Sequence, residues 1–465
     1  MISRPSEMTG RPAEPHHNRP QFDSRALWAL LTTLGVLVIL TMPWLGSDAW
    51  PFVPGPVDAH GLLGWLVEIA DDEFDLGLLR SLVVLAGVAV ALAVALVWRQ
   101  PTWPRGAAIA FTVVIVGALL VPATLLQVGL RDATEPWLFT NDSTYQIELA
   151  GDLILDGDNP YGHDYSESGL ERFYPAVDAP PDLPQVAVDH FAYFPGTALS
   201  AAAWRLLPGP LDDYRIFVML ATFALLFAAL LFPAPLIWKL PIGAVLAANP
   251  LAVRGSWFGT ADAPALLALV LAFGLLVRGR LFWAAASLGV AVSLKQFALI
   301  AFPFFAVMLI TMGIPRRTIL RAGGVFLGVA LATFLPFLIA DPGALWEDTI
   351  AYGADTYRIV GYGLSALLLN LGVIDDRFGY YPFLPLAVFV WLPVTVWLLI
   401  SQRRSGLLWP GALGFAVSIS LLFFISRVFQ NSYLLWPLVG LGLAYLLAAS
   451  RRPAAAYSAP SAREE

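Results

Sequence analysis

Asp142 is the residue whose type and position are best suited to acid–base chemistry. It follows an apolar segment within Asn141-Asp142-Ser143-Thr144-Tyr145. From Tyr145 apolar residues recur at helical spacing as far as Gly157, so we expect an amphipathic helix with Asp142 near its N-terminus. A carboxylate there could take a proton from a hydroxyl group. Asp is also a common N-cap, and the local sequence is consistent with both roles.

Cations that could bind an anion stand near the ends of apolar segments, at Arg254, Lys295, Arg358 and Arg427. Polar and aromatic residues that could contact a substrate occur beside them, at Tyr145, His190, Tyr193, Asp262 and Gln430. Singly, such residues are more often interface or snorkelling side chains than ligands. Together they favour a phosphate site at the membrane surface with a carboxylate base beside it.

Other catalytic motifs lack support in this chain. Asp156-Gly157-Asp158 matches a metal-binding D-x-D pattern, but we interpret it as a helix-ending turn because no nucleotide-binding α/β domain accompanies it. No metal site or cofactor is predicted, although a divalent metal is not excluded. There is no Cys, and phosphate-binding-loop, serine-hydrolase and zincin motifs are absent. The few basic residues do not favour nucleic-acid binding.

The elements that must position these residues are membrane helices. Of the 465 residues, 58% are hydrophobic and 13% are charged, and the mean hydropathy is +0.71. Apolar segments near the length that crosses a bilayer recur along the chain, which predicts an all-α polytopic membrane protein. The predicted spans are 26–45, 77–98, 107–129, 214–232, 236–253, 261–277, 281–295, 297–314, 319–340, 382–400, 407–425 and 432–449. Segment 191–207 is interpreted as re-entrant, which gives about twelve transmembrane helices, within a range of 11–13.

Charge distribution predicts the orientation. Short basic segments, such as Arg316-Arg317 and Arg403-Arg404, are expected in the cytoplasm. Segment 131–190 carries thirteen Asp and Glu against two Arg and is expected outside. A second exterior loop is predicted at 341–381, with interfacial helices in these loops. The remaining predictions are one transmembrane domain, 26–449, with disordered cytoplasmic ends at 1–25 and 450–465, in the cell membrane.

The order of these motifs is similar to that of a known enzyme class. The motifs are Asp142-x-x-Tyr145, Gly157-x-Asn-Pro-Tyr161, Tyr193-Phe-Pro-Gly196, Asn249-Pro250, Gly259-x-x-Asp262 and Gly289-x₅-Lys295, and the similarity covers about residues 107–449. The chain resembles integral-membrane glycosyltransferases of the GT-C fold, particularly glycosyltransferase family 87, the polyprenyl-phosphomannose-dependent mannosyltransferases.

The resemblance implies a polyprenyl-phosphate sugar donor, with mannose as the favoured hexose, and an exterior glycan or glycolipid acceptor. It implies that Asp142 is the general base. Lys295 and Arg427, followed by Arg358 and Arg254, would bind the donor phosphate. We therefore expect Asp142 within about 10 Å of Lys295 or Arg427 in a polar cavity. A transporter or lipid flippase is the alternative, and it would require ionisable residues in the middle of spans. A membrane scaffold without catalytic activity is a third reading.

Overall fold

The computed structural model describes residues 22–41, 59–69, 76–97, 102–134, 140–173, 188–356 and 358–450. Within these ranges the protein is built of helices, with two short pairs of strands. Strand β1 (Phe22–Asp23) pairs antiparallel with β2 (Thr102–Trp103), and β3 (Val360–Gly361) pairs parallel with β4 (Val428–Phe429). The predicted all-α class is confirmed. Most of both predicted disordered ends lies outside the described residues.

Among the described residues, five helical segments are long and apolar enough to cross a membrane. They are Leu79–Val97 within α3 (Leu76–Val97), α4 (Arg105–Ala133), α13 (Arg316–Ala340), Phe383–Ser405 and Asn431–Ala449. Phe383–Ser405 comprises α16 (Phe383–Leu386), η8 (Ala387–Trp391) and α17 (Leu392–Ser405), and Asn431–Ala449 comprises η9 (Asn431–Leu434) and α19 (Leu435–Ala449). A sixth exists if α8 (Leu236–Ala248) and α9 (Pro250–Phe258), which are bent by 42°, count as one. These helices indicate a multi-pass membrane protein.

The other predicted spans are shorter helices. They are α1 (Ser24–Val38), α7 (Tyr214–Leu230), α10 (Ala263–Val277), α11 (Leu281–Leu294), α12 (Ala301–Thr311) and α18 (Trp409–Ile425). Each of the twelve predicted segments thus contains helix. A straight helix of about 20 residues is needed to cross the hydrocarbon, so helix length supports five or six spans among the described residues, and twelve stays a prediction.

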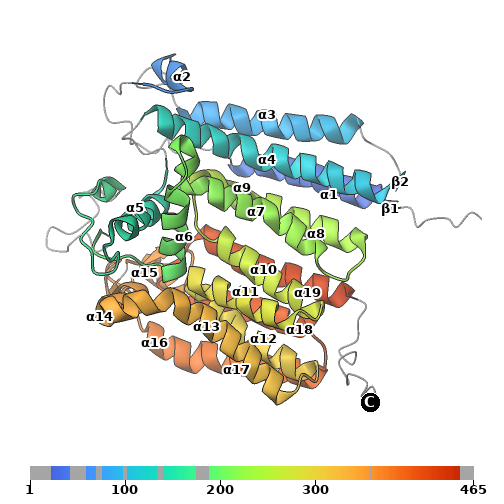
Figure 1. Ribbon diagram of the computed structural model, residues 1–465, viewed down its shortest axis with the longest axis vertical. Coiled ribbons are helices and arrows are strands. Elements are labelled where there is room, and N and C mark those ends of the chain that lie inside the picture. The colour runs from blue at the N-terminus through green and yellow to red at the C-terminus, as the bar shows by residue number, and fades with distance from the viewer. Residues whose placement is uncertain are drawn as a thin grey trace, which may run out of the picture.

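The apolar helices lie side by side, and several short helices gather at one end of the bundle (Figure 1). These are α5 (Asp142–Asp156), α6 (Pro195–Arg205), α14 (Pro342–Trp346) and α15 (Leu364–Asn370). Helix α6 packs against α5 and is not among the candidate membrane spans of the described residues. The first turns of α4 and α13, which begin at Arg105 and Arg316, and the last turn of α17, which contains Arg403 and Arg404, lie at the opposite end of the bundle (Figure 1). The other end of α4 carries Arg131, which pairs with Glu148 of α5.

Local capping groups fix both ends of α5. Asn141 is the N-cap, because its side chain accepts a hydrogen bond of 2.7 Å from the Thr144 N–H. Gly157 ends the helix with φ +90°, and the N–H of Asp158 donates to the Leu153 carbonyl at 2.8 Å. The predicted helix and the interpretation of Asp156-Gly157-Asp158 as its ending turn are confirmed. Asn141, and not Asp142, caps α5.

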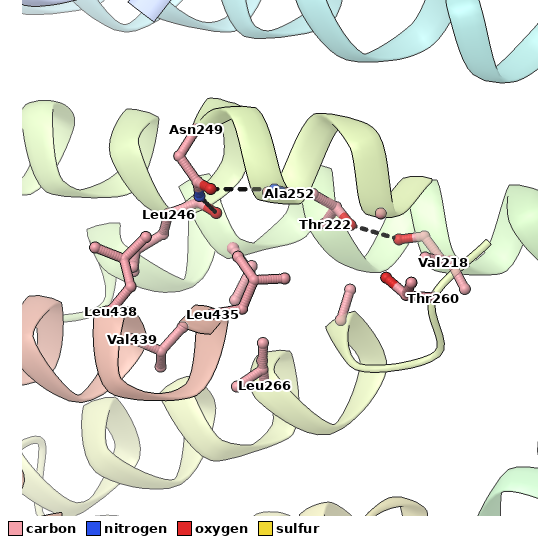
Figure 2. Close-up of a pocket in the computed structure, with 13 residues that line it drawn as sticks. Val218, Thr222, Leu246, Asn249, Ala252, Thr260, Leu266, Leu435, Leu438 and Val439 are labelled. Carbon is pink, nitrogen blue, oxygen red and sulfur yellow. Dashed lines mark hydrogen bonds between the residues drawn. The ribbon is translucent and has the colours of Figure 1, made fainter. Parts of the chain in front are cut away.

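The break between α8 and α9 is built around Asn249 (Figure 2). Its side chain accepts from the Ala252 N–H at 3.1 Å and donates to the Val245 carbonyl at 2.8 Å, which satisfies both helix ends. A cavity of about 10 Å³ lies beside the break, lined largely by apolar side chains. The bend carries α9 to Gly259 (φ +98°), whose carbonyl accepts a hydrogen bond from the Thr144 hydroxyl. The start of α5 is thereby attached to the end of α9.

Close packing of α5 on α6 requires a glycine. A Cβ atom on Gly151 would lie 2.8 Å from the Ala202 nitrogen and 2.9 Å from the Ala201 carbonyl carbon, both of which are backbone. Gly151→Ala is therefore expected to cost about 1–3 kcal/mol of stability. The measurement is the midpoint of thermal unfolding of the purified protein. Gly117→Ala in α4, where a Cβ meets nothing within 4 Å, is the control. Equal midpoints for the two variants would contradict this packing.

Candidate functional site

A cavity of about 460 Å³ is lined by residues of the short helices and of the adjoining ends of the bundle helices. It is lined by the first turn of α5, the segment before α6, the end of α9, the turn after α11, the η7 helix (Glu347–Thr356) and the region from α18 to η9. Six of the ten residues predicted from sequence line it: Asp142, His190, Tyr193, Asp262, Lys295 and Gln430. Residues distant in sequence thus share one cavity.

Asp142 occupies the first position of α5 at the cavity wall. Its Oδ1 accepts a hydrogen bond of 2.8 Å from the Ser143 N–H. Because Asn141 is the N-cap, the carboxylate of Asp142 is not required to cap the helix. Gln146, one turn further on, also lines the cavity and donates to the His190 carbonyl at 2.8 Å. The first turn of α5 therefore supplies polar groups to one face of the cavity.

Lys295 and Asp262 form an ion pair across the cavity wall. Lys295 Nζ lies 3.7 Å from Asp262 Oδ1, and the Trp436 indole N–H donates to the same oxygen at 3.0 Å. Both charged side chains are less than 10% exposed. Helix α11 ends at Leu294, and Lys295 adopts an extended conformation (φ −150°) before the chain turns into η6 (Gln296–Ile300). The end of that helix thus sets a cation beside the cavity.

Tyr193 links the two carboxylates to the lysine. Lys295 Nζ lies 4.6 Å from the centre of the Tyr193 ring. Burial raises the pKa of the Tyr193 hydroxyl well above its usual value, and the charges of Asp142 and Asp262 raise it further, against a hydrogen bond with Ser143 that lowers it. Tyr193 therefore stays protonated, and its surroundings bring Asp142 and the Asp262–Lys295 pair into one polar region.

Asp348, a buried acidic residue that contacts the cavity-lining His190, was not among the predicted site residues. It is 2% exposed, and its Oδ1 lies 2.7 Å from His190 Nδ1. Its Oδ2 accepts from the N–H groups of Gly162 at 2.9 Å and Phe191 at 3.3 Å. No local signal in the sequence marks Asp348, because its partners are more than 150 residues away. Only its place in the acidic second loop could have drawn attention to it.

Four predicted residues do not line this cavity. Arg427 is 2% exposed, and its Nη1 donates to the Gly379 carbonyl at 3.1 Å, inside the second loop. The Arg254 guanidinium lies 4.6 Å from the centre of the Phe258 ring. The Tyr145 hydroxyl donates to the Ser168 carbonyl at 2.7 Å. Arg358 is half-buried beside β3. Within the described residues, the contacts of Tyr145 and Arg427 fit roles in packing the two loops, and that of Arg254 lies within α9.

A buried network of charges holds α5 in place. Arg131 at the end of α4 donates to Glu148 Oε2 at 2.6 Å and to Asp213 Oδ2 at 3.2 Å. Arg215 Nη2 contacts the same Asp213 oxygen at 2.6 Å, and the Tyr214 N–H donates to Glu148 Oε1 at 2.8 Å. Glu148 lies on α5, so the network ties α5 to α4 and α7. It fixes the helix that begins at Asp142.

The cavity is amphipathic. Its lining combines polar residues with apolar ones, including Phe297, Ile300, Leu422 and Phe423. Such a lining suits a ligand with a charged or polar head and an apolar chain. Among the described residues, no group of three or more His, Asp or Glu side chains is arranged to hold a metal ion. The residues that could act on a bound headgroup are thus the carboxylates, the lysine and the histidine.

Comparison of the chain with protein-family models, curated proteins and solved structures gave no match. The likeness to a glycosyltransferase family therefore rests on the motifs in the sequence.

Proposed function

We propose that the protein is a membrane glycosyltransferase that moves a hexose, with mannose favoured, from a polyprenyl-phosphate sugar to a glycan or glycolipid acceptor. The observation that carries this proposal is an amphipathic cavity whose lining includes both Asp142 and Lys295. A base and a phosphate-binding cation in one cavity suit transfer from a phosphate leaving group. The apolar wall suits a lipid chain.

In this reaction Asp142 takes the proton from an acceptor hydroxyl. The acceptor oxygen forms a bond to the anomeric carbon, while the bond from that carbon to the phosphate oxygen breaks. The electron pair leaves with the polyprenyl phosphate, and Lys295 stabilises its growing negative charge. The carboxylate of Asp262, 3.7 Å from the lysine Nζ, holds this cation at the cavity. Arg427, Arg254 and Arg358 do not line the cavity, so we assign the phosphate to Lys295.

The proposed orientation places the cavity on the exterior side of the cell membrane. Its support is the separation of charge along the bundle, since helix ends that carry arginine tend to face the cytoplasm. The first turns of α4 and α13 and the last turn of α17, which begin or end in arginine-bearing segments, lie away from α5 and α6 (Figure 1), while Arg131 at the other end of α4 is neutralised by Glu148 and Asp213. The donor and the acceptor would both enter from the exterior leaflet.

The test is a transfer assay with the purified full-length protein, radiolabelled polyprenyl-phosphate mannose and a membrane lipid extract. The expected result is label in a new lipid or glycan product and release of polyprenyl phosphate. Persistence of the intact donor, with no labelled product, would contradict the proposal.

A flippase would move the donor without consuming it. The same labelled lipid in sealed vesicles distinguishes the two functions, because transport makes label accessible on the other leaflet while its chemical form is unchanged. Movement without a change of chemical form would favour the flippase.

Lys295→Met is expected to weaken binding of polyprenyl phosphate about tenfold, because it removes the cation from a largely buried phosphate site. The measurement is the Kd for the radiolabelled lipid. Lys239→Met is the control. Lys239 lies on α8, donates a hydrogen bond to the carbonyl of Leu230 at the end of α7, and does not line the cavity. Equal affinity of Lys295→Met and the unaltered protein would remove Lys295 from the phosphate site.

A further inference from the structure

An unusual helix forms part of the cavity wall. Residues Glu347–Thr356 form η7, a π-helix of ten residues. Such helices are rare and are frequently found at functional sites. Thr349, Ile350 and Tyr352 of η7 line the cavity, and Asp348 of the same helix contacts His190. The Tyr352 ring lies 4.5 Å from the His190 ring, at an angle of 30°. Asp348 and Tyr352, both on η7, thus contact the side chain of His190.

The contact with Asp348 determines which ring nitrogen of His190 carries the proton. A buried carboxylate accepts hydrogen bonds, so Nδ1 of His190 carries the proton that points at Asp348 Oδ1, 2.7 Å away. Neutral imidazole then has its acceptor lone pair at Nε2. His190 lines the cavity and its side chain is 18% exposed, whereas Asp348 is buried. Nε2, the acceptor nitrogen, is therefore the ring nitrogen that does not contact Asp348.

Both carboxylate oxygens of Asp348 have hydrogen-bond partners within the protein, so Asp348 does not contact a ligand itself. The N–H groups of Gly162 and Phe191 both donate to its second oxygen, Oδ2. The carboxylate thereby joins three segments: the turn after α5, the segment before α6, and η7. Its effect on a ligand must pass through His190, which makes Asp348 a positioning residue.

The geometry points to a sugar-hydroxyl site in this cavity, in which His190 Nε2 accepts a hydrogen bond from a hexose hydroxyl and Asp348 fixes the imidazole. This inference rests on the proposed function and adds a contact to the sugar that is distinct from the phosphate site at Lys295. The hydroxyl belongs either to the donor hexose or to the acceptor glycan, and the two sources can be separated by experiment. In both cases a ligand that carries phosphate but no sugar is not recognised by His190.

His190→Asn is the variant that tests the Nε2 acceptor most directly. The asparagine amide can still donate to Asp348 from near the position of Nδ1, while the acceptor at Nε2 is lost. Binding of radiolabelled polyprenyl-phosphate mannose and of polyprenyl phosphate is measured on the full-length protein. The KM for octyl α-mannoside, used as an acceptor probe, is measured in the transfer assay. Asp152→Asn is the control, because Asp152 pairs with Arg205 on α6, outside the cavity.

Loss of one hydrogen bond corresponds to about a tenfold weaker interaction. A tenfold higher Kd for polyprenyl-phosphate mannose, with an unchanged Kd for polyprenyl phosphate, assigns the hydroxyl to the donor hexose. An unchanged Kd for both lipids, with a tenfold higher KM for octyl α-mannoside, assigns it to the acceptor. Equal weakening of both lipids, or no change in any of the three constants, overturns the inference.

Asp348→Asn tests the positioning role. It is expected to shift the same constant as His190→Asn, and the double variant should be no worse than either single variant, because both changes remove one contact. Additive losses would overturn the positioning role of Asp348. If Asp348→Asn fails to fold, His190→Asn alone decides the inference. If the unaltered protein binds neither lipid and transfers no sugar, the proposed function itself fails, and this result is distinct from the others.

Discussion

Replacing Asp142 with asparagine is expected to lower the rate of sugar transfer about a thousandfold. A positioned general base typically contributes a factor of about a hundred to ten thousand, and an amide cannot take a proton from the acceptor hydroxyl. The shape of the side chain is preserved, and the asparagine carbonyl can accept the hydrogen bond that Ser143 N–H now donates to Oδ1 at 2.8 Å. The loss should therefore fall on the rate, with donor binding little changed.

The measurement is the transfer rate at saturating donor, together with the Kd for polyprenyl-phosphate mannose. Asp156→Asn is the matched control, since Asp156 ends the same helix, is exposed and does not line the cavity. It should transfer sugar at the normal rate. An Asp142→Asn protein that folds and keeps a tenth or more of the activity would show that another group accepts the proton.

Much of the helical framework could be predicted from periodicity and length. Each predicted apolar segment contains a helix, and α5 begins and ends within a few residues of the predicted bounds. These features are local, because apolar spacing and cap residues act within a few turns. The position of breaks was harder to predict. Segment 236–253 is divided at Asn249, where a side chain satisfies both helix ends.

The predicted site residues also fall into two groups, those that line the cavity and those that do not. Asp142, Asp262 and Lys295 stand next to helix ends in the sequence, and each of these ends opens onto the cavity. Arg427 also follows a helix end, but its guanidinium turns to the carbonyl of Gly379, 48 residues earlier. Arg427 directly precedes β4, which pairs with β3, and strands of only two residues have no recognisable pattern in the sequence.

Asp348 shows what a single sequence cannot reveal. Its importance depends on three donors from two other segments, which meet only after folding. The sequence around it resembles any acidic loop, and the π-helix that carries it has no reliable sequence signature. Charge predicted only that the loop containing Asp348 lies on the exterior side of the membrane. The assignment of a role needed the distance from its carboxylate to His190.

Replacing Glu148 with glutamine is expected to lower the stability of the protein by about 3–5 kcal/mol. Glu148 is 2% exposed and accepts from both terminal nitrogens of Arg131, at 2.6 and 3.0 Å. Removal of this charge from a buried network costs Arg131 its closer carboxylate and leaves only Asp213, at 3.2 Å, as its partner, which is a severe loss. The glutamine amide would also place N–H groups against Arg131. Since α5 depends on this contact, transfer activity should fall with stability.

Thermal unfolding of the purified protein measures the effect. Asp152→Asn, on the same helix, is the control, because Asp152 pairs with Arg205 while its side chain is 42% exposed, and such pairs contribute about 1 kcal/mol or less. Equal unfolding midpoints for Glu148→Gln and Asp152→Asn would show that the network does not hold α5.

The same network predicts how stability depends on pH. Burial alone would raise the pKa of Asp213, but Arg215 and Arg131 hold it far below its usual value. A carboxyl group whose pKa is lower in the folded state stabilises the protein above the unfolded pKa of about 4. That contribution is lost as the pH falls through the folded pKa. In Glu148→Gln, Arg131 keeps Asp213 as a partner, so acid should destabilise the variant further; a variant whose stability is indifferent to acid would contradict this account of the network.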